Sequence, residues 1–66
     1  MTYRLVVGEK GNEQGHIRAT AAKTILGAQI ALGKALAPYA GNGWGRIEEK
    51  VDGVGITWAR VTEYRQ

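Results

Sequence analysis

The sequence predicts a small α+β domain of the order ββαββ, in which a four-stranded antiparallel sheet carries one helix packed on one face. Two β-rich segments, 2–9 and 16–19, flank a polar turn at 10–15. A helical pattern of apolar residues follows over 21–36 and stops before Pro38. The remaining chain predicts strands at 44–51 and 54–64 around Asp52-Gly53, a hairpin signal. The length of 66 residues predicts one domain, 1–66.

The first two strands should each present alternating faces. In the first strand, Tyr3, Leu5 and Val7 share one face, and Arg4 and Val6 share the other. In the second strand, we expect the following arrangement: Ile17 and Ala19 toward the core, His16 and Arg18 toward solvent.

The helix is expected to begin after Thr20, a suitable N-cap residue. Its apolar stripe at 3.6-residue spacing consists of Ala22, Ile25, Leu26, Leu32 and Leu36. Gly33 lies on the same stripe, where a close approach of the helix to the sheet would explain a glycine.

A two-residue turn at Asp52-Gly53 sets the register of the last hairpin. It pairs Val51 with Val54 and Ile47 with Trp58. Trp58 is therefore expected in the core, while Trp44, Arg46, Glu48 and Lys50 belong to the opposite face.

The composition argues against an enzyme. The chain has no cysteine and no serine, and His16 is its one histidine. The common nucleophile–base pairs therefore cannot form, except from threonine, and a metal site lacks ligands. We expect no cofactor. No segment approaches the roughly 18 apolar residues of a membrane span, and the start of the chain lacks the apolar core of a signal peptide, so the expected location is the cytoplasm.

The outer face of the predicted sheet is the first candidate contact surface. It is expected to collect Arg4, His16, Arg18, Arg46 and Lys50, with Trp44 beside them. Cations with an aromatic side chain suit phosphate contact and base stacking, and they equally suit an acidic protein surface. The alternative is an ordinary solvated sheet face. The net charge of +3 is in keeping with acidic partners.

The back of the helix is the second candidate surface. Thr24, Ala28, Ala31 and Ala35 form an uncharged strip of small residues, flanked by Lys23 and Lys34. Solvent-facing helix positions usually carry charge, so the strip suggests a contact face or a dimer seam. The alternative is that alanine is simply the best helix former.

The order of these segments resembles a known family. It comprises a strand near Tyr3, a short strand at Ile17-Arg18-Ala19, a helix with Ala22-Lys23, then Arg46-Ile47-Glu48, Val51-Asp52-Gly53 and a tryptophan-bearing last strand. This layout resembles small phage-encoded anti-CRISPR proteins that act on type I systems, over nearly the whole chain. The resemblance implies a cytoplasmic, non-enzymatic inhibitor that binds the RNA-guided surveillance complex (Cascade) and blocks its binding to target DNA. A net charge of +3 departs from the acidic DNA mimicry common among such inhibitors.

Three functional hypotheses remain open. The first is an inhibitor that binds a protein subunit of a type I CRISPR effector complex. The second is a small nucleic-acid-binding module that uses Arg4, Arg18, Arg46, Lys50 and Trp44 on DNA or RNA. The third is a homodimeric regulatory or structural protein, joined through the back of the helix or through an edge strand.

Overall fold

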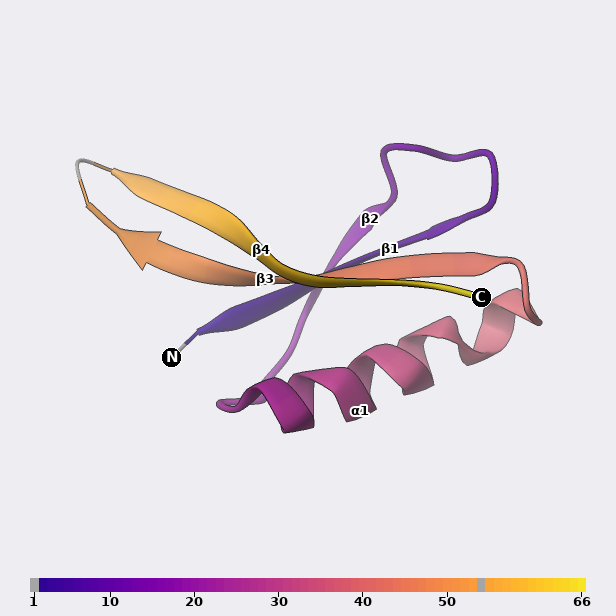
Figure 1. Ribbon diagram of the computed structural model, residues 1–66, viewed down its shortest axis with the longest axis horizontal. Coiled ribbons are helices and arrows are strands. Elements are labelled where there is room, and N and C mark those ends of the chain that lie inside the picture. The colour runs from indigo at the N-terminus through magenta and orange to yellow at the C-terminus, as the bar shows by residue number, and fades with distance from the viewer. Residues whose placement is uncertain (1, 54) are drawn as a thin grey trace.

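The computed structural model of the chain describes residues 2–53 and 55–66, with the side chain of Ile56 also outside the description. The elements are β1 (Tyr3–Glu9), β2 (His16–Ala19), α1 (Ile25–Leu36), the 3-10 turn η1 (Ala37–Tyr39), β3 (Gly43–Asp52) and β4 (Ile56–Arg65). The strands form one four-stranded sheet in the order β2-β1-β3-β4, and every neighbouring pair is antiparallel. The helix lies across one face of this sheet (Figure 1). The predicted ββαββ fold class is thus confirmed.

The hydrophobic core lies between α1 and the two central strands. Tyr3, Leu5 and Val7 of β1 and Ile47 of β3 pack against the helix through its buried residues Ala28, Leu32 and Leu36. The alternation predicted for β1 is therefore confirmed. The close approach between helix and sheet occurs at Gly45, not at Gly33. A methyl group on Gly45 would lie 2.5 Å from Leu32 Cδ1, whereas one on Gly33 would meet nothing within 4 Å.

The start of α1 differs from the prediction. The N-cap is Thr24, which has extended backbone angles and accepts a hydrogen bond from the Gly27 N–H through Oγ1 at 3.1 Å. Thr20 instead accepts from the Ala22 N–H at 3.2 Å, in a local turn that precedes the helix. Both threonines can satisfy free backbone donors, but only Thr24 is followed directly by helical residues. The helix therefore begins at Ile25 rather than Ala21.

The face that α1 turns toward the sheet also corrects the prediction. Leu32 and Leu36 are buried as expected, but Leu26 is 68% exposed and Ile25 is 43% exposed. Ala28 is fully buried, because a small side chain lets the helix backbone approach the sheet. The strip of Thr24, Ala28, Ala31 and Ala35 is consequently not the back of the helix: Ala31 and Ala35 pack against the core, and Thr24 is the N-cap.

The β3–β4 hairpin is shifted from the predicted register. Asp52 pairs with Ile56 and Lys50 with Trp58, so three residues, 53–55, connect the strands instead of two. Val51 therefore meets a residue three positions later than predicted, and a displacement by an odd number of residues turns side chains to the other face of the sheet. Trp58 accordingly lies on the face away from α1, not in the core. The expected pairing of Val51 with Val54 falls on a position outside the described residues; Val51 pairs with Thr57.

A bulge lies farther along the same hairpin. Thr62 pairs with Ile47 and Arg60 with Glu48, which leaves Val61 as the extra residue of β4. Val61 packs against the core on the α1 side. A bulge adds one residue to one strand, so the register of the β3–β4 pairing changes by one residue at Val61. The two faces of the sheet nevertheless continue across the bulge.

Candidate interaction face on the outer side of the sheet

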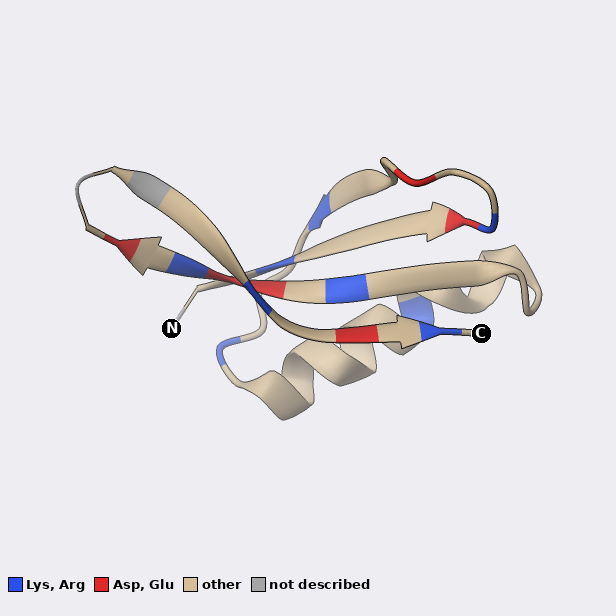
Figure 2. Ribbon diagram, turned by 45° about the horizontal axis from the view of Figure 1, so that its top comes forward, with Lys and Arg blue, Asp and Glu red and all other residues tan. Residues whose placement is uncertain are grey.

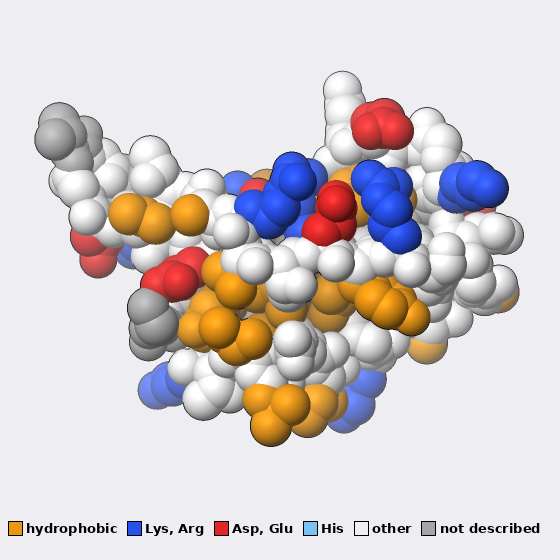
Figure 3. Space-filling model, in the orientation of Figure 1, with side chains coloured by type: hydrophobic (Ala, Val, Ile, Leu, Met, Phe, Trp, Pro, Cys, Tyr) orange, Lys and Arg blue, Asp and Glu red, His pale blue; other side chains and the backbone are white. Residues whose placement is uncertain are grey.

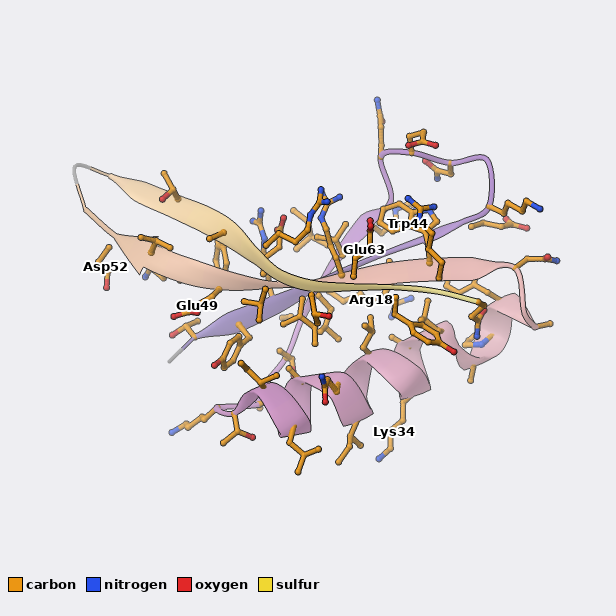
Figure 4. All side chains as sticks on the ribbon, in the orientation of Figure 1. Arg18, Lys34, Trp44, Glu49, Asp52 and Glu63 are labelled. Carbon is orange, nitrogen blue, oxygen red and sulfur yellow. The ribbon has the colours of Figure 1, made fainter. Side chains whose placement is uncertain are left out.

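The outer face is defined here as the side of the sheet away from α1. Its charged and aromatic members from β1 and β3 include Arg4, Trp44, Arg46, Glu48 and Lys50, and β4 adds Trp58, Arg60, Glu63 and Arg65. Figure 4 shows Trp44 and Glu63 on this side, and Lys34 on the far side of the helix. The predicted cluster of Arg4, Arg46, Lys50 and Trp44 is therefore brought onto one face.

Two predicted members of the cluster lie elsewhere. Arg18 pairs with Leu5, and His16 pairs with Val7, so both share the α1 side of the sheet with those core residues. Ile17, expected in the core, pairs with Val6 on the outer face and is 65% exposed. The side chains of β2 thus face the opposite sides of the sheet from those predicted, because the loop from β1 sets the register of this strand. All four β2 residues are exposed.

A carboxylate lies at the centre of the outer face. Arg4 Nε donates to Glu48 Oε1 at 2.7 Å, and Arg46 Nε donates to Glu48 Oε2 at 3.1 Å. Glu48 is only 8% exposed, and the two guanidinium groups replace the hydration that its carboxylate has lost. This triad carries one net positive charge.

Two tryptophan rings continue the triad in opposite directions. The guanidinium carbon of Arg4 lies 4.4 Å from the centroid of the Trp58 ring. The guanidinium carbons of Arg46 and Arg65 lie 5.7 and 5.9 Å, respectively, from the centroid of the Trp44 ring. These distances are within the range of cation–π attraction. The result is a row from Trp58 through Arg4, Glu48 and Arg46 to Trp44.

Trp44 has a structural role on this face. Its indole Nε1–H donates to Asn12 O in the β1–β2 loop at 2.9 Å, and the residue is 5% exposed. The ring lies against Gly8 and Gly15, where an added methyl group would come within 2.7 to 2.8 Å of it. The β1–β2 loop thus covers Trp44, which was predicted to be the aromatic residue that contacts a partner. The half-exposed aromatic of the face is Trp58.

The accessible cations of the face are Lys50, Arg60 and Arg65. Arg60 and Arg65 are exposed, and Lys50 is half-buried. Carboxylates lie between these cations. Glu63 Oε1 lies 3.6 Å from Arg65 Nη2, and Glu48 of β3 pairs with Arg60 of β4. The space-filling view shows charges of both signs along the upper surface (Figure 3), and the ribbon view shows basic and acidic positions along β3 and β4 (Figure 2).

Sequence reasoning missed Trp58, Arg60 and Arg65 on this face. The signal that would have found Trp58 and Arg60 is the second glycine of the turn: Gly55 lies two positions after Gly53 and has a positive φ of 149°. A glycine at each end of a three-residue connection favours the longer loop over the two-residue turn. The longer loop moves Trp58 and Arg60 onto the outer face, and the bulge at Val61 then brings Arg65 to the same face.

The outward surface of α1 bears a smaller apolar patch. Leu26 and Ile30 are 68% and 56% exposed, one helical turn apart, and Lys34 follows one turn later. Lys23 is exposed and precedes the first residue of the helix by two positions. Figure 3 shows the apolar patch between two blue patches at the lower edge of the molecule. Lys34 therefore lies on the far side of the helix from the outer sheet face (Figure 4).

Two hollows lie beside the sheet. One of about 390 Å³ lies between α1 and β4 and is lined by Gln29, Leu32, Gly33, Leu36, Thr62, Glu63, Tyr64 and Gln66. The other, of about 330 Å³, lies at the Trp44 end of the sheet, where Lys10, Asn42 and Arg65 contribute to its walls. Within residues 2–53 and 55–66, no group of three or more His, Cys, Asp or Glu side chains is placed to hold a metal ion. In the same part of the chain no helix has the length and apolar character needed to span a bilayer.

Comparison with known proteins adds no relative. No protein-family model matches the chain, and no curated protein or solved structure does so either.

Proposed function

We propose that this protein is a non-enzymatic inhibitor that attaches the outer face of its sheet to a protein subunit of a type I CRISPR surveillance complex. The observation that carries the proposal is the pattern of that face: the half-exposed Trp58 lies beside Lys50 and Arg60, around the Arg4–Glu48 pair. Tryptophan and arginine are the residues most enriched at binding hot spots.

The mixture of charges favours a protein partner. Glu48 already accepts hydrogen bonds from Arg4 and Arg46, so these two cations are partly neutralised. Glu63 adds a further carboxylate beside Arg65. A phosphate backbone presents one sign of charge only, whereas a protein surface can complement both signs. Lys50 and Arg60, which form no ion pair within the described residues, would face acidic side chains of the partner.

The family resemblance supports the same assignment. Its segment Arg46-Ile47-Glu48 lies on β3, where Arg46 and Glu48 belong to the central triad of the outer face. An inhibitor of this family that carries net charge +3 would occupy an acidic or interdomain protein surface instead of imitating DNA. Its site of action would be the cytoplasm of the bacterial host.

The experiment measures target-DNA binding by a purified type I surveillance complex with and without the protein. Lys50→Glu and Trp58→Ala alter the outer face, and Lys34→Glu makes the same charge change on the far side of α1. We expect the wild-type protein and Lys34→Glu to reduce target binding equally. Each outer-face variant should need about tenfold more protein for the same inhibition, as hot-spot truncations commonly require.

Two outcomes would contradict the proposal. One is a complex that binds its target normally in the presence of the wild-type protein. The other is equal inhibition by the wild-type protein and by both outer-face variants, which would move the contact to another surface. Circular dichroism of each variant verifies that the fold is retained.

Nucleic-acid binding is the second candidate, and the exposure of Trp58 favours it. A half-exposed indole next to Lys50 and Arg60 is able to stack a base while the cations contact phosphates. This function predicts that the protein alone shifts free DNA or RNA and that its affinity falls steeply with salt. Free nucleic acid that stays unbound at low salt would exclude it.

A further inference from the structure

Strand β4 presents a long free edge. It spans ten residues and is outermost in the sheet order, whereas the other edge strand, β2, has four residues. An outermost strand carries backbone N–H and C=O groups that point away from the sheet and can pair with another strand. Figure 1 shows β4 along one margin of the sheet, with its outer side uncovered along the hairpin that extends past α1.

The direction of the backbone groups follows from one hydrogen bond. The Gln66 N–H donates to Gly43 O of β3 at 2.9 Å, so the groups of Gln66 point inward. Alternation then points those of Arg65 and Glu63 toward the free edge. The side chains of Arg65 and Glu63 lie on the outer face. On the other side of the bulge, Arg60 and Trp58 likewise have side chains on the outer face and backbone groups that point toward the free edge.

These outward residues are spaced symmetrically. Trp58, Arg60, Glu63 and Arg65 are separated by two, three and two positions, a spacing that is the same read from either end. The central gap of three contains Val61 and Thr62, at the bulge. A second β4, antiparallel to the first, therefore matches all four positions at once.

The matched pairs are complementary in chemistry. Arg60 lies opposite Glu63 of the second copy, and Trp58 lies opposite Arg65 of the second copy, each pair occurring twice by symmetry. Opposite charges and cation–aromatic pairs directly across an antiparallel ladder are stabilising. Arg60 forms no ion pair within the described residues, so the pairing supplies it with one.

Other registers lose this match. If one strand slides by two residues, Arg60 still meets an outer-face residue of the other strand. Thr62, whose side chain faces α1, then lies opposite Glu63, whose side chain is on the outer face. The bulge thus selects a single register. Only when the two bulges lie opposite each other do outward-pointing backbone groups meet outward-pointing groups, and outer-face side chains meet outer-face side chains, along the whole strand.

We propose that β4 pairs with β4 of a second copy of this chain, about a two-fold axis between Val61 and Thr62. The two sheets would join into one continuous sheet, with both outer faces on the same side. The dimer forms through the backbone edge of the sheet, and its matched pairs include Trp58 and Arg60, which also belong to the outer face proposed above as the partner contact. Its test needs only the purified chain, so its failure is distinguishable from a failure of the proposed function.

The experiment is sedimentation equilibrium of the full chain. The wild-type protein should approach twice the 7.1 kDa chain mass as its concentration rises toward about 1 mM. Arg60→Glu and Glu63→Arg each place like charges opposite one another at both symmetric pairs. Each variant should weaken dimerisation by about tenfold or more.

Mixing the two variants gives a sharper result. A heterodimer of Arg60→Glu with Glu63→Arg has opposite charges at both pairs, so the mixture should associate while neither component does alone. The double variant Arg60→Glu/Glu63→Arg should dimerise like the wild type. Lys34→Glu, a charge reversal on α1, should leave dimerisation unchanged.

The proposal is overturned if the wild-type protein keeps the mass of one chain across this concentration range. It is also overturned if the mixture of single variants associates no better than its components. Circular dichroism of the single variants separates a lost dimer from a lost fold, and the charge-restored mixture supplies the same check internally.

Discussion

Arg4 of β1 and Glu48 of β3 are joined by a 2.7 Å hydrogen bond from Nε to Oε1, and Arg46 Nε reaches the second carboxylate oxygen at 3.1 Å. Glu48 is buried, so these two donors take the place of water as hydrogen-bond partners of its carboxylate. The pair also holds the Arg4 guanidinium 4.4 Å from the Trp58 ring. The arrangement of the outer face therefore depends on a single carboxylate.

Replacing Glu48 with Gln should destabilise the fold. The substitution keeps the shape but leaves two guanidinium groups without their counter-charge, and we expect the free energy of unfolding to fall by about 1–3 kcal/mol. Urea denaturation measures this loss. Glu13→Gln, on the exposed β1–β2 loop, is the matched control and should change stability little. A Glu48→Gln protein as stable as this control would contradict the structural role of the triad.

The same glycine-to-alanine change should have opposite effects at two positions. A methyl group on Gly8 would lie 2.7 Å from the Trp44 ring, so Gly8→Ala should displace the indole and lower stability by about 1–3 kcal/mol. Gly33 lies in α1 with open space around its Cα, and Gly33→Ala should raise stability by about 0.5–1 kcal/mol. Thermal unfolding compares the two variants. A gain of stability in Gly8→Ala would mean that Trp44 is not packed as described.

The helix cap predicts a difference between two threonines. Thr24→Ala removes the oxygen that accepts from the Gly27 N–H and should lower the free energy of unfolding by about 1 kcal/mol. Thr20→Ala removes only a turn hydrogen bond to the Ala22 N–H and should have a smaller effect. Chemical denaturation of both variants ranks them. The reverse order would place the start of the helix at residue 21.

The orientation of α1 predicts which helix positions tolerate a charge. Ala28 is fully buried against the sheet, so Ala28→Glu should unfold the domain or destabilise it by about 3 kcal/mol or more. Ile30 is 56% exposed on the opposite side, and Ile30→Glu should remain within about 0.5 kcal/mol of the wild type. Circular dichroism melting curves report both. Loss of the fold in Ile30→Glu alone would show the opposite helix orientation.

The two tryptophans should differ in their access to a fluorescence quencher. Trp44 is 5% exposed and hydrogen-bonded to Asn12 O, whereas Trp58 is half-exposed. Trp58→Phe leaves Trp44 as the one tryptophan, and Trp44→Phe leaves Trp58, so selective excitation of the indole reports each in turn. Acrylamide should quench the Trp58 emission several-fold more strongly. Equal quenching constants would mean that the β1–β2 loop does not cover Trp44.

The sequence determined the kind and the order of the elements. β-Branched and apolar residues around Leu5 and Val7, and the long apolar pattern ending before Pro38, act locally on the backbone, so they predicted strands and a helix without knowledge of their neighbours. The two-sided character of β1 followed from the same alternation, because a strand has a period of two wherever it lies in the sheet. Arg4, Arg46 and Lys50 were correctly placed on one face for this reason.

The tertiary structure alone decided which partners the elements meet. The three-residue loop at 53–55 and the extra Val61 set the register of β4. The loop displaces the pairing of β4 by three residues, an odd number, which moves Trp58 from the predicted core to the outer face. The close approach of Leu32 to Gly45 decided that α1 turns Ala28 and not Leu26 toward the sheet. Periodicity along one segment leaves such choices open, because each depends on how much apolar area two segments bury together and how closely their backbones can approach.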